Sequence, residues 1–401
     1  MFGNHTPQVK RMFDTIIVGG GLAGLSLAEH LPNALIVETY PSWGGRVVTH
    51  RSPQYEIGAG RIFSGHTRVH ALIRRFGLHT FPIPHEPNEF LSLFTPIRVY
   101  LESLDTTILA NHTISELIPE TLHPILKRFP YTAELSVLRA DVALPLFRGD
   151  GTMGSTKSEY CGIVEGMDAL ITHLVHANQR HGTVMKTRHT VHNILQTNSV
   201  FEIQGTKGKS KTPFRFQGRN IVLATSVYAF SKIPIVQNLP IVKQLGTSPL
   251  LRIYAVYPPN SDGKVWFHRM SKIVTDKRLR HIIPINEDKG LIMVSYTDGE
   301  DTFFWKEHIQ QNTLDHTIHK ELQSMFPTKT IPAPIYLRAH NWPDGCTYWL
   351  PGNYDVNKAI QEAIQPIPNL YICGESVSNH QTWMEGALES AERILSILTK
   401  G

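Results

Sequence analysis

Asp14-Thr15-Ile16-Ile17-Val18-Gly19-Gly20-Gly21-Leu22-Ala23-Gly24 is the stretch of this 401-residue chain that decides its fold. Its first five residues are rich in β-branched side chains, which favour a strand. The glycines follow at once, residues 25–31 are compatible with a helix, and a second apolar run at 34–37 ends in Glu38. This order predicts a strand, a glycine turn, a helix and a second strand, which together form a unit of a parallel α/β sheet.

The spacing of the glycines points to a ligand. Gly19, Gly21 and Gly24 form the pattern G-x-G-x-x-G. In this setting the first glycine allows a tight turn, the second lets a pyrophosphate approach the backbone, and the third lets helix and strand pack closely. The helix N-terminus then faces the phosphates with unpaired N–H groups and the positive end of its dipole, and we count Leu22 and Ala23 with the glycines as candidate cofactor contacts. The spacing therefore predicts a dinucleotide site.

Glu38 closes the second predicted strand. Its carboxylate is there placed to accept hydrogen bonds from the hydroxyls of an adenosine ribose. A glycine-rich turn without a ligand is the alternative, and the flanking strands together with this acid favour the nucleotide. The motif alone does not separate NAD from FAD.

The rest of the chain alternates between two kinds of sequence pattern. Its length suits about two domains, and α/β patterns return near both Asn220 and Asn369, separated by stretches richer in proline and aromatic residues. We therefore predict an α/β fold with a Rossmann-type nucleotide-binding domain from residues 12–75, 161–227 and 340–401. An α+β substrate-binding domain would consist of two inserts, residues 76–160 and 228–339.

Composition excludes several classes of protein. Hydrophobic residues make up 41% of the chain and charged residues 18%, as in a folded globular protein. The net charge of +5 comes from scattered basic residues, so no nucleic-acid surface is expected. The first insert contains more acidic than basic residues, which favours a cationic substrate. The absence of a long apolar run and of a signal peptide, together with only three cysteines, predicts a soluble cytoplasmic protein with no membrane contact. We assign no metal ligands and no oligomeric state.

The residues after Glu38 distinguish the cofactor. Gly44, Gly45 and Arg46 free the backbone for close approach and place a cation beside the phosphates. Here the sequence resembles the flavin-containing amine oxidase family, which includes monoamine oxidases, polyamine oxidases and lysine-specific histone demethylases. The resemblance implies FAD as the cofactor.

Further elements carry the same resemblance in order along the chain. Residues 56–61 look like the family segment whose backbone lies against the isoalloxazine ring, which implies cofactor contacts for Gly58, Ala59, Gly60 and Arg61. Val191 falls where the family places a valine whose backbone contacts adenine. Near the C-terminus, two elements match those that hold the ribityl chain, the pyrophosphate and the flavin ring: Gly374 and Glu375, then Trp383, Met384 and Gly386.

The resemblance also implies an aromatic cage that orients an amine over the flavin. Trp383 would form one wall, and Tyr348 or Trp349 the other, because the register of residues 345–352 leaves both open. Each aromatic residue could equally belong to the core. Cys346 lies near the position where monoamine oxidases attach FAD covalently, but a small buried cysteine is commoner, so we expect non-covalent FAD.

One position departs from the family. Most members place a lysine, linked through water to flavin N5, where this chain has Arg252. Arginine does not readily release a proton, so a role as a base would be lost while electrostatic stabilisation of reduced flavin could remain. An arginine on an exposed strand face is the alternative.

Taken together, these motifs predict an FAD-dependent oxidase of a primary or secondary amine. Molecular oxygen would be the final acceptor, and the products would be an imine and hydrogen peroxide. A porphyrinogen oxidase or carotenoid desaturase type of reaction is the alternative within enzymes. A protein that carries FAD and binds a partner without catalysis is the alternative outside them.

Overall fold

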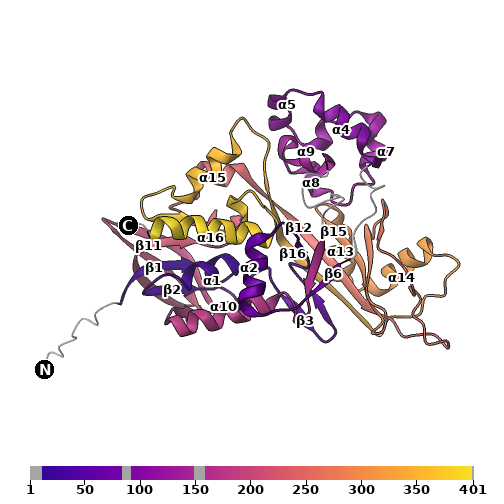
Figure 1. Cartoon of the computed structure of the whole chain (residues 1–401), viewed down its shortest axis with the longest axis horizontal. Helices are drawn as coiled ribbons and strands as arrows, with labels where there is room; N and C mark the ends of the chain where they lie inside the picture. The colour runs from indigo at the N-terminus through magenta and orange to yellow at the C-terminus, as the bar shows by residue number, and fades with distance from the viewer. Residues whose placement is uncertain (1–10, 84–91, 149–158, 400–401) are drawn as a thin grey trace.

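The computed structural model describes residues 11–83, 92–148 and 159–399. Figure 1 shows a large mixed sheet with its helices at one end of the molecule, a second sheet at the other end, and a lobe of short helices above the second sheet. The segments of the chain that build the first sheet lie far apart in the sequence. The prediction of an α/β fold with a second, α+β part is confirmed.

The first sheet has seven strands, five of which take part in parallel pairs. The strand order is β8 (Val184–Lys186), β2 (Ala34–Val37), β1 (Met12–Val18), β11 (Thr212–Leu223), β10 (Val200–Lys207) and β9 (His189–Thr197), and β17 (Leu370–Ile372) pairs with β11. β8, β2, β1 and β17 run parallel to the neighbours they pair with, while β9, β10 and β11 form antiparallel pairs. Strands from three separated parts of the chain therefore share one sheet.

Side-chain alternation in the parallel strands divides the core into two layers. Ile17 and Ile36 pack on the face covered by helices, and Ile16 and Leu35 pack on the other face. The covering helices are α1 (Leu22–Ala28), α2 (Thr67–Phe76), α10 (Asp168–His181) and α16 (Met384–Leu398). Helix α1 contacts both α10 and α16, which fixes the glycine turn at its N-terminus over the end of β1.

The second sheet is antiparallel and has five strands. Their order is β13 (Ile273–Val274), β14 (His281–Asn286), β15 (Leu291–Asp298), β12 (Leu245–Val256) and β16 (Tyr336–Trp349). Helices α13 (Asp301–Gln310) and α14 (Leu314–Met325) complete the hydrophobic core on this sheet. The domain boundary expected between residues 339 and 340 falls inside β16, so this strand links the two parts of the fold.

Short elements make up the helical lobe, two small sheets and the remaining connections. The helical lobe consists of α4 (Thr95–Glu102), α5 (Thr106–Asn111), α6 (Ile114–Leu117), η1 (Glu120–Leu122), α7 (His123–Leu126), α8 (Ala133–Ser136) and α9 (Ala140–Arg148). The small sheets consist of β3 (Thr49–Arg51) with β4 (Gln54–Glu56), and of β5 (Ile62–Phe63), β7 (Tyr160–Ile163) and β6 (Thr80–Ile83). The remaining elements are α11 (Val227–Phe230), α12 (Pro240–Gln244), α15 (Val356–Ile364) and η2 (Glu375–Val377). Among the described residues, no helix has the length and apolar character needed to cross a membrane.

Candidate functional site

The glycine turn has the geometry that its spacing predicts. Gly19 has a φ of +116°, and a Cβ there would lie 2.2 Å from the carbonyl oxygen of Ala224. A Cβ at Gly24 would lie 2.1 Å from the carbonyl oxygen of Gly19. Both positions therefore exclude a side chain, the first for the turn and the second for the packing of α1 on β1.

Three other glycines would instead leave a Cβ at ordinary contact distances. The nearest atom to a Cβ built on Gly21 is the Gly44 oxygen at 4.0 Å, and the nearest to one on Gly45 is the Gly21 Cα at 3.6 Å. A Cβ on Gly374 would come no closer than 3.8 Å to the Ser376 hydroxyl. Gly21 is also the N-cap of α1, where Leu22 and Ala23 begin the helix. An open backbone face at a helix N-terminus fits the pyrophosphate of FAD.

Glu38 lies at the end of β2, as expected. Its carboxylate accepts hydrogen bonds from the backbone N–H groups of Gly20 and Tyr40, each at 2.8 Å. Burial raises the pKa of this carboxyl, and these two bonds oppose the shift. The backbone oxygen of Glu38 accepts from His189 N–H at 2.8 Å, so β9, which carries Val191, begins beside the same acid.

Arg46, from the N-terminal part of the chain, bonds residues of the C-terminal part. Its guanidinium donates to Glu375 at 2.7 Å and to the carbonyl oxygen of Gly345 at 3.0 Å. Glu375 also accepts from the Thr347 hydroxyl at 3.1 Å and the Thr382 N–H at 2.7 Å. Burial alone would lower the pKa of Arg46, but the Glu375 carboxylate raises it, so the cation is firmly held beside the open glycine face.

The segment from Glu56 to Arg61 packs directly on Arg46. Ala59 N–H donates to the Arg46 carbonyl oxygen at 2.9 Å, and a Cβ at Gly58 would lie 1.8 Å from the same oxygen. Arg252, on β12, donates to the carbonyl oxygens of Glu56 and Gly58, and Gly60 lies next to its guanidinium. Arg252 is therefore not on an exposed strand face, and it is directed at the segment that the resemblance places against the flavin ring.

Trp383 lies at the N-cap of α16 and belongs to a group of aromatic rings. Its ring is nearly parallel to that of Tyr160, with centroids 6.4 Å apart and an interplanar angle of 15°. The Arg61 guanidinium carbon lies 5.6 Å from the Trp383 centroid and 4.9 Å from the Tyr160 centroid. Arg61 also donates to the Tyr131 hydroxyl at 2.8 Å. We call Arg61, Tyr160 and Trp383 the aromatic gate.

The two candidates for the opposite wall have different surroundings. Adjacent residues of a strand project to opposite faces. Both belong to the main hydrophobic core: Trp349 is 2% exposed and its ring packs against Tyr354, and Tyr348 is 4% exposed. The Tyr348 hydroxyl lies beside the Cys346 thiol, close enough to Glu134 and Asp298 for both charges to affect it. Of the two, Tyr348 is the one placed among polar groups.

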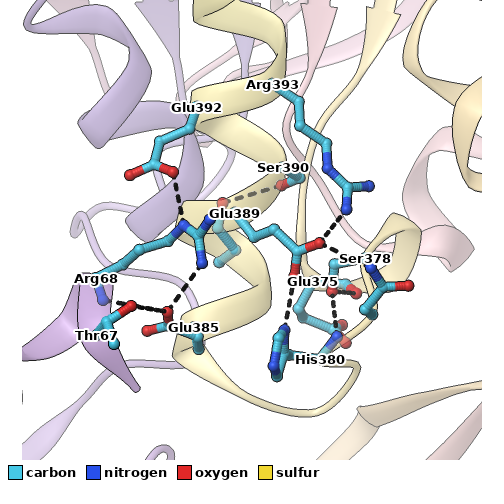
Figure 2. Close-up of polar contacts among 12 residues, drawn as sticks. Thr67, Arg68, Glu375, Ser378, His380, Glu385, Glu389, Ser390, Glu392 and Arg393 are labelled. Carbon is cyan, nitrogen blue, oxygen red and sulfur yellow. Dashed lines mark hydrogen bonds and ion pairs between the residues drawn. The ribbon is translucent and has the colours of Figure 1, made fainter. Parts of the chain in front are cut away.

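The first turn of α16 holds two neighbouring segments in place (Figure 2). The Glu385 carboxylate accepts from the backbone N–H groups of Arg68 and Val69, each at 3.1 Å, and so caps α2. A Cβ at Gly386 would lie 2.2 Å from the Ser378 hydroxyl, so only glycine admits the 378–380 turn there. Met384 is 7% exposed and packs in the core under α1.

Two residues near the gate were not predicted. Tyr160 comes from the end of the first insert, and no local pattern links it to Trp383, more than 200 positions later. Glu134 is one of several acidic residues in that insert. Nothing in the sequence around it distinguishes it from the acidic residues that are exposed. Only the pairing of β5 with β7 and the placement of α8 bring them to the site.

Comparison with known proteins identifies the family. The model of the family described as flavin containing amine oxidoreductase matches residues 22–143 and 128–394. The chain belongs to this family. The bovine protein named amine oxidase [flavin-containing] A is 35% identical over 85 residues, which are 20% of this chain and 16% of the bovine protein. The horse protein of the same name is 34% identical over 79 residues, which are 18% of this chain and 15% of that protein.

Solved structures share the whole fold. The cyclohexylamine oxidase from Brevibacterium oxydans IH-35A matches with a TM-score of 0.73 at 16% identity, over 97% of this chain and 99% of that one. A putrescine oxidase bound to putrescine matches with a TM-score of 0.73 at 14% identity, over 98% of this chain and 100% of that one. The predicted family, its flavin cofactor and the fold are thus confirmed, and the matched stretches of the mammalian relatives span about a sixth of their length.

Proposed function

We propose that this family member is an FAD-dependent amine oxidase. It would convert a primary or secondary amine into an imine, with oxygen as the final acceptor and hydrogen peroxide as the second product. The observation that carries the proposal is the aromatic gate: Trp383 and Tyr160 stand nearly parallel beside Arg61, which ends the segment expected to lie against the flavin. An amine directed by these rings would approach the cofactor in a fixed orientation.

The cofactor contacts follow the open glycine face and its neighbours. We propose that FAD is bound by residues of four segments and one strand: Gly19, Gly21, Leu22, Ala23, Gly24 and Glu38; Gly45 and Arg46; Gly58, Ala59, Gly60 and Arg61; Gly374, Glu375, Trp383, Met384 and Gly386; and Val191. The fit of Gly21, Gly45 and Gly374 to a bulky ligand supports this set.

Non-covalent binding is favoured by the chemistry of Cys346. Burial raises the pKa of its thiol to about 12, although Arg46 opposes the shift. The thiolate, which is the nucleophilic form, is then scarce at neutral pH. We expect acid precipitation to release all of the flavin as FAD, and flavin in the pellet would contradict this.

The bound flavin supplies the hydride acceptor, so the protein needs no nucleophile of its own. Its residues orient the amine, exclude water and stabilise charge. Burial alone would lower the pKa of Arg252, but the facing Tyr296 and Tyr254 hydroxyls raise it, so this side chain is a permanent cation and not a base. We propose that Arg252 stabilises reduced flavin and that Tyr348 lines the amine site.

A panel of amines tests the activity. Peroxide release should be followed with benzylamine, cyclohexylamine, putrescine and spermidine, in parallel with anaerobic bleaching of the flavin absorbance. At least one amine should reduce the flavin and yield one peroxide per imine in air. Flavin that stays oxidised with every amine would overturn the proposal and favour a protein that carries FAD without catalysis. The cations Arg61 and Arg252 and the polar carboxyl of Glu134 disfavour the purely apolar substrate of a desaturase.

A further inference from the structure

Glu134 occupies an unusual position in the helical lobe. It is the second residue of α8 (Ala133–Ser136), and this helix is fixed to the second sheet by Asp298. The Asp298 carboxylate accepts from Ala133 N–H at 2.8 Å and from Thr132 N–H at 3.1 Å. The Glu134 side chain is therefore held in a defined direction by the backbone that carries it.

The Glu134 carboxyl has no hydrogen-bond partner in the described structure. Its Oε2 atom is buried, while the residue as a whole stays partly accessible. Three other acids around the site are bonded: Glu38 by two N–H groups, Glu375 by Arg46 and two further donors, and Asp298 by α8. Asp344 also has buried carboxylate oxygens without a hydrogen bond, but the Arg46 cation lies close to it. A buried carboxyl without partners is costly, so its presence calls for a ligand or a proton.

The groups that face Glu134 include Arg61 of the aromatic gate. The Arg61 charge favours its ionised form, and the Asp298 carboxylate opposes it. The Tyr348 hydroxyl on β16 is close enough to be affected by the Glu134 charge. Arg61 in turn lies 5.6 Å from the Trp383 ring. The other residues of α8 carry no titratable group. Glu134 is thus the carboxyl of the helical lobe that shares Arg61 with the aromatic gate.

We propose that Glu134 receives the substrate's ammonium group at the aromatic gate and accepts its proton, so that the amine reaches the flavin uncharged. The step is balanced: R–CH2–NH3⁺ and the Glu134 carboxylate become R–CH2–NH2 and the Glu134 carboxylic acid. The N–H bond of the ammonium breaks, and an O–H bond forms on Glu134. This proposal rests on the proposed amine oxidation, in which only a neutral amine can give up a hydride. It assigns to Glu134 a proton-accepting role that Arg252 cannot fill.

The acidity of Glu134 suits this task. Burial raises the pKa of its carboxyl to about 8, with Asp298 adding to the shift and Arg61 opposing it. An alkyl ammonium has a pKa of about 10. The proton transfer is therefore uphill by a modest amount, which a following fast step tolerates. Bulk water, a far weaker base than a carboxylate, would be a poorer acceptor in the same place.

The pH profile of kcat/KM tests the proposal. In the wild type, the reacting complex must carry one proton in total on Glu134 and the amine nitrogen. The plot of kcat/KM against pH should therefore be bell-shaped. Its acid limb should lie near pH 8, the pKa of Glu134, and its alkaline limb near the pKa of the amine, about 10. Glu134→Gln can use only amine that is already neutral in solution. Its profile should rise up to the pKa of the amine without falling again, so the ratio of wild-type to variant kcat/KM should fall about tenfold for each pH unit above 8.

A binding experiment gives a readout that is independent of turnover. Benzyltrimethylammonium is a permanent cation with no proton to lose, and its binding to holoenzyme can be followed by calorimetry at pH 7 in buffers of different ionisation enthalpy. Wild type should release close to one proton per site, because the cation forces Glu134 to ionise. Glu134→Gln should release none. Glu120→Gln, which removes an exposed carboxylate of the same lobe, should behave as wild type in both experiments.

The outcomes separate the two proposals. If an amine of the panel reduces the flavin but Glu134→Gln keeps the bell-shaped profile, the role of Glu134 is wrong and the oxidase activity stands. The role of Glu134 is also wrong if the wild-type pH profile has no acid limb near pH 8 and the wild type releases no proton on binding the cation. This test needs only the wild type, so it holds even if Glu134→Gln does not fold. If no amine reduces the flavin, the proposed oxidase itself is wrong.

Discussion

At the scale of single residues, Trp383 is where cofactor binding and catalysis can be told apart. It is the N-cap residue of α16, and its ring packs against Tyr160 and His66. The residues expected to hold FAD at that end, Gly374 and Glu375, are fixed by other bonds, to Ser390 and Arg46. Loss of the Trp383 ring should therefore leave most of the FAD contacts in place.

Trp383→Ala should retain most of its FAD and lose flavin reduction by amine. Misorientation by about an ångström costs on the order of a hundredfold in rate, which anaerobic stopped-flow measures directly. Trp383→Tyr keeps a ring parallel to Tyr160 and should recover much of that rate. An alanine variant that loses FAD and melts earlier, while its remaining holoenzyme reacts normally, would show that Trp383 is only part of the core.

At the scale of elements, α16 connects the C-terminal segment to α2. Glu385 is 2% exposed and bonds the first-turn N–H groups of α2 together with the Arg68 guanidinium, while Arg68 also pairs with the exposed Glu392 (Figure 2). One arginine thus has a buried and an exposed carboxylate partner. These two pairs should differ in their contribution to stability, because an exposed ion pair is screened and a buried one also satisfies backbone donors.

Glu385→Ala should lower the free energy of unfolding by about 2 kcal/mol, from the lost helix cap and from the donors left without an acceptor. Glu392→Ala removes the exposed partner of the same arginine and should change stability little. Urea denaturation of both apo variants gives the comparison. Equal losses would show that the cap on α2 contributes nothing beyond a surface charge pair.

The elements that local patterns define were predictable, and those that depend on long-range packing were not. The runs at 14–18 and 34–37 became β1 and β2, and the glycine turn followed, because its geometry is set by adjacent residues. Helix α1 begins at Leu22, three residues before the expected 25, since the N-terminus of a helix after such a turn starts within the motif itself. Tyr160 and Glu134 reach the gate only through strand pairing and the docking of α8, which no single segment encodes.

At the scale of the molecule, the proposed FAD site gathers segments from both ends of the chain. The open face of Gly21 and Gly45 meets Gly374 through the Arg46–Glu375 ion pair, and Figure 1 shows the N-terminal and C-terminal elements side by side in the first sheet and its helices. A ligand that contacts all of them closes a loop of more than 300 residues. The free energy of FAD binding then adds to the free energy of unfolding of the whole fold.

Adding FAD to apo protein should therefore raise the thermal midpoint of the whole unfolding transition. The free energy of unfolding should increase by about 2.7 kcal/mol when free FAD is in a hundredfold excess over its Kd. Gly21→Val is the matched variant. Its φ of −78° suits any residue, and a Cβ there meets no atom closer than 4.0 Å, so the apo protein should melt as wild type does. The valine would nevertheless occupy the space of the pyrophosphate, and the rise with FAD should vanish. Scanning calorimetry of both proteins with and without FAD measures this. A valine variant that gains the same stabilisation would place the cofactor elsewhere in the molecule.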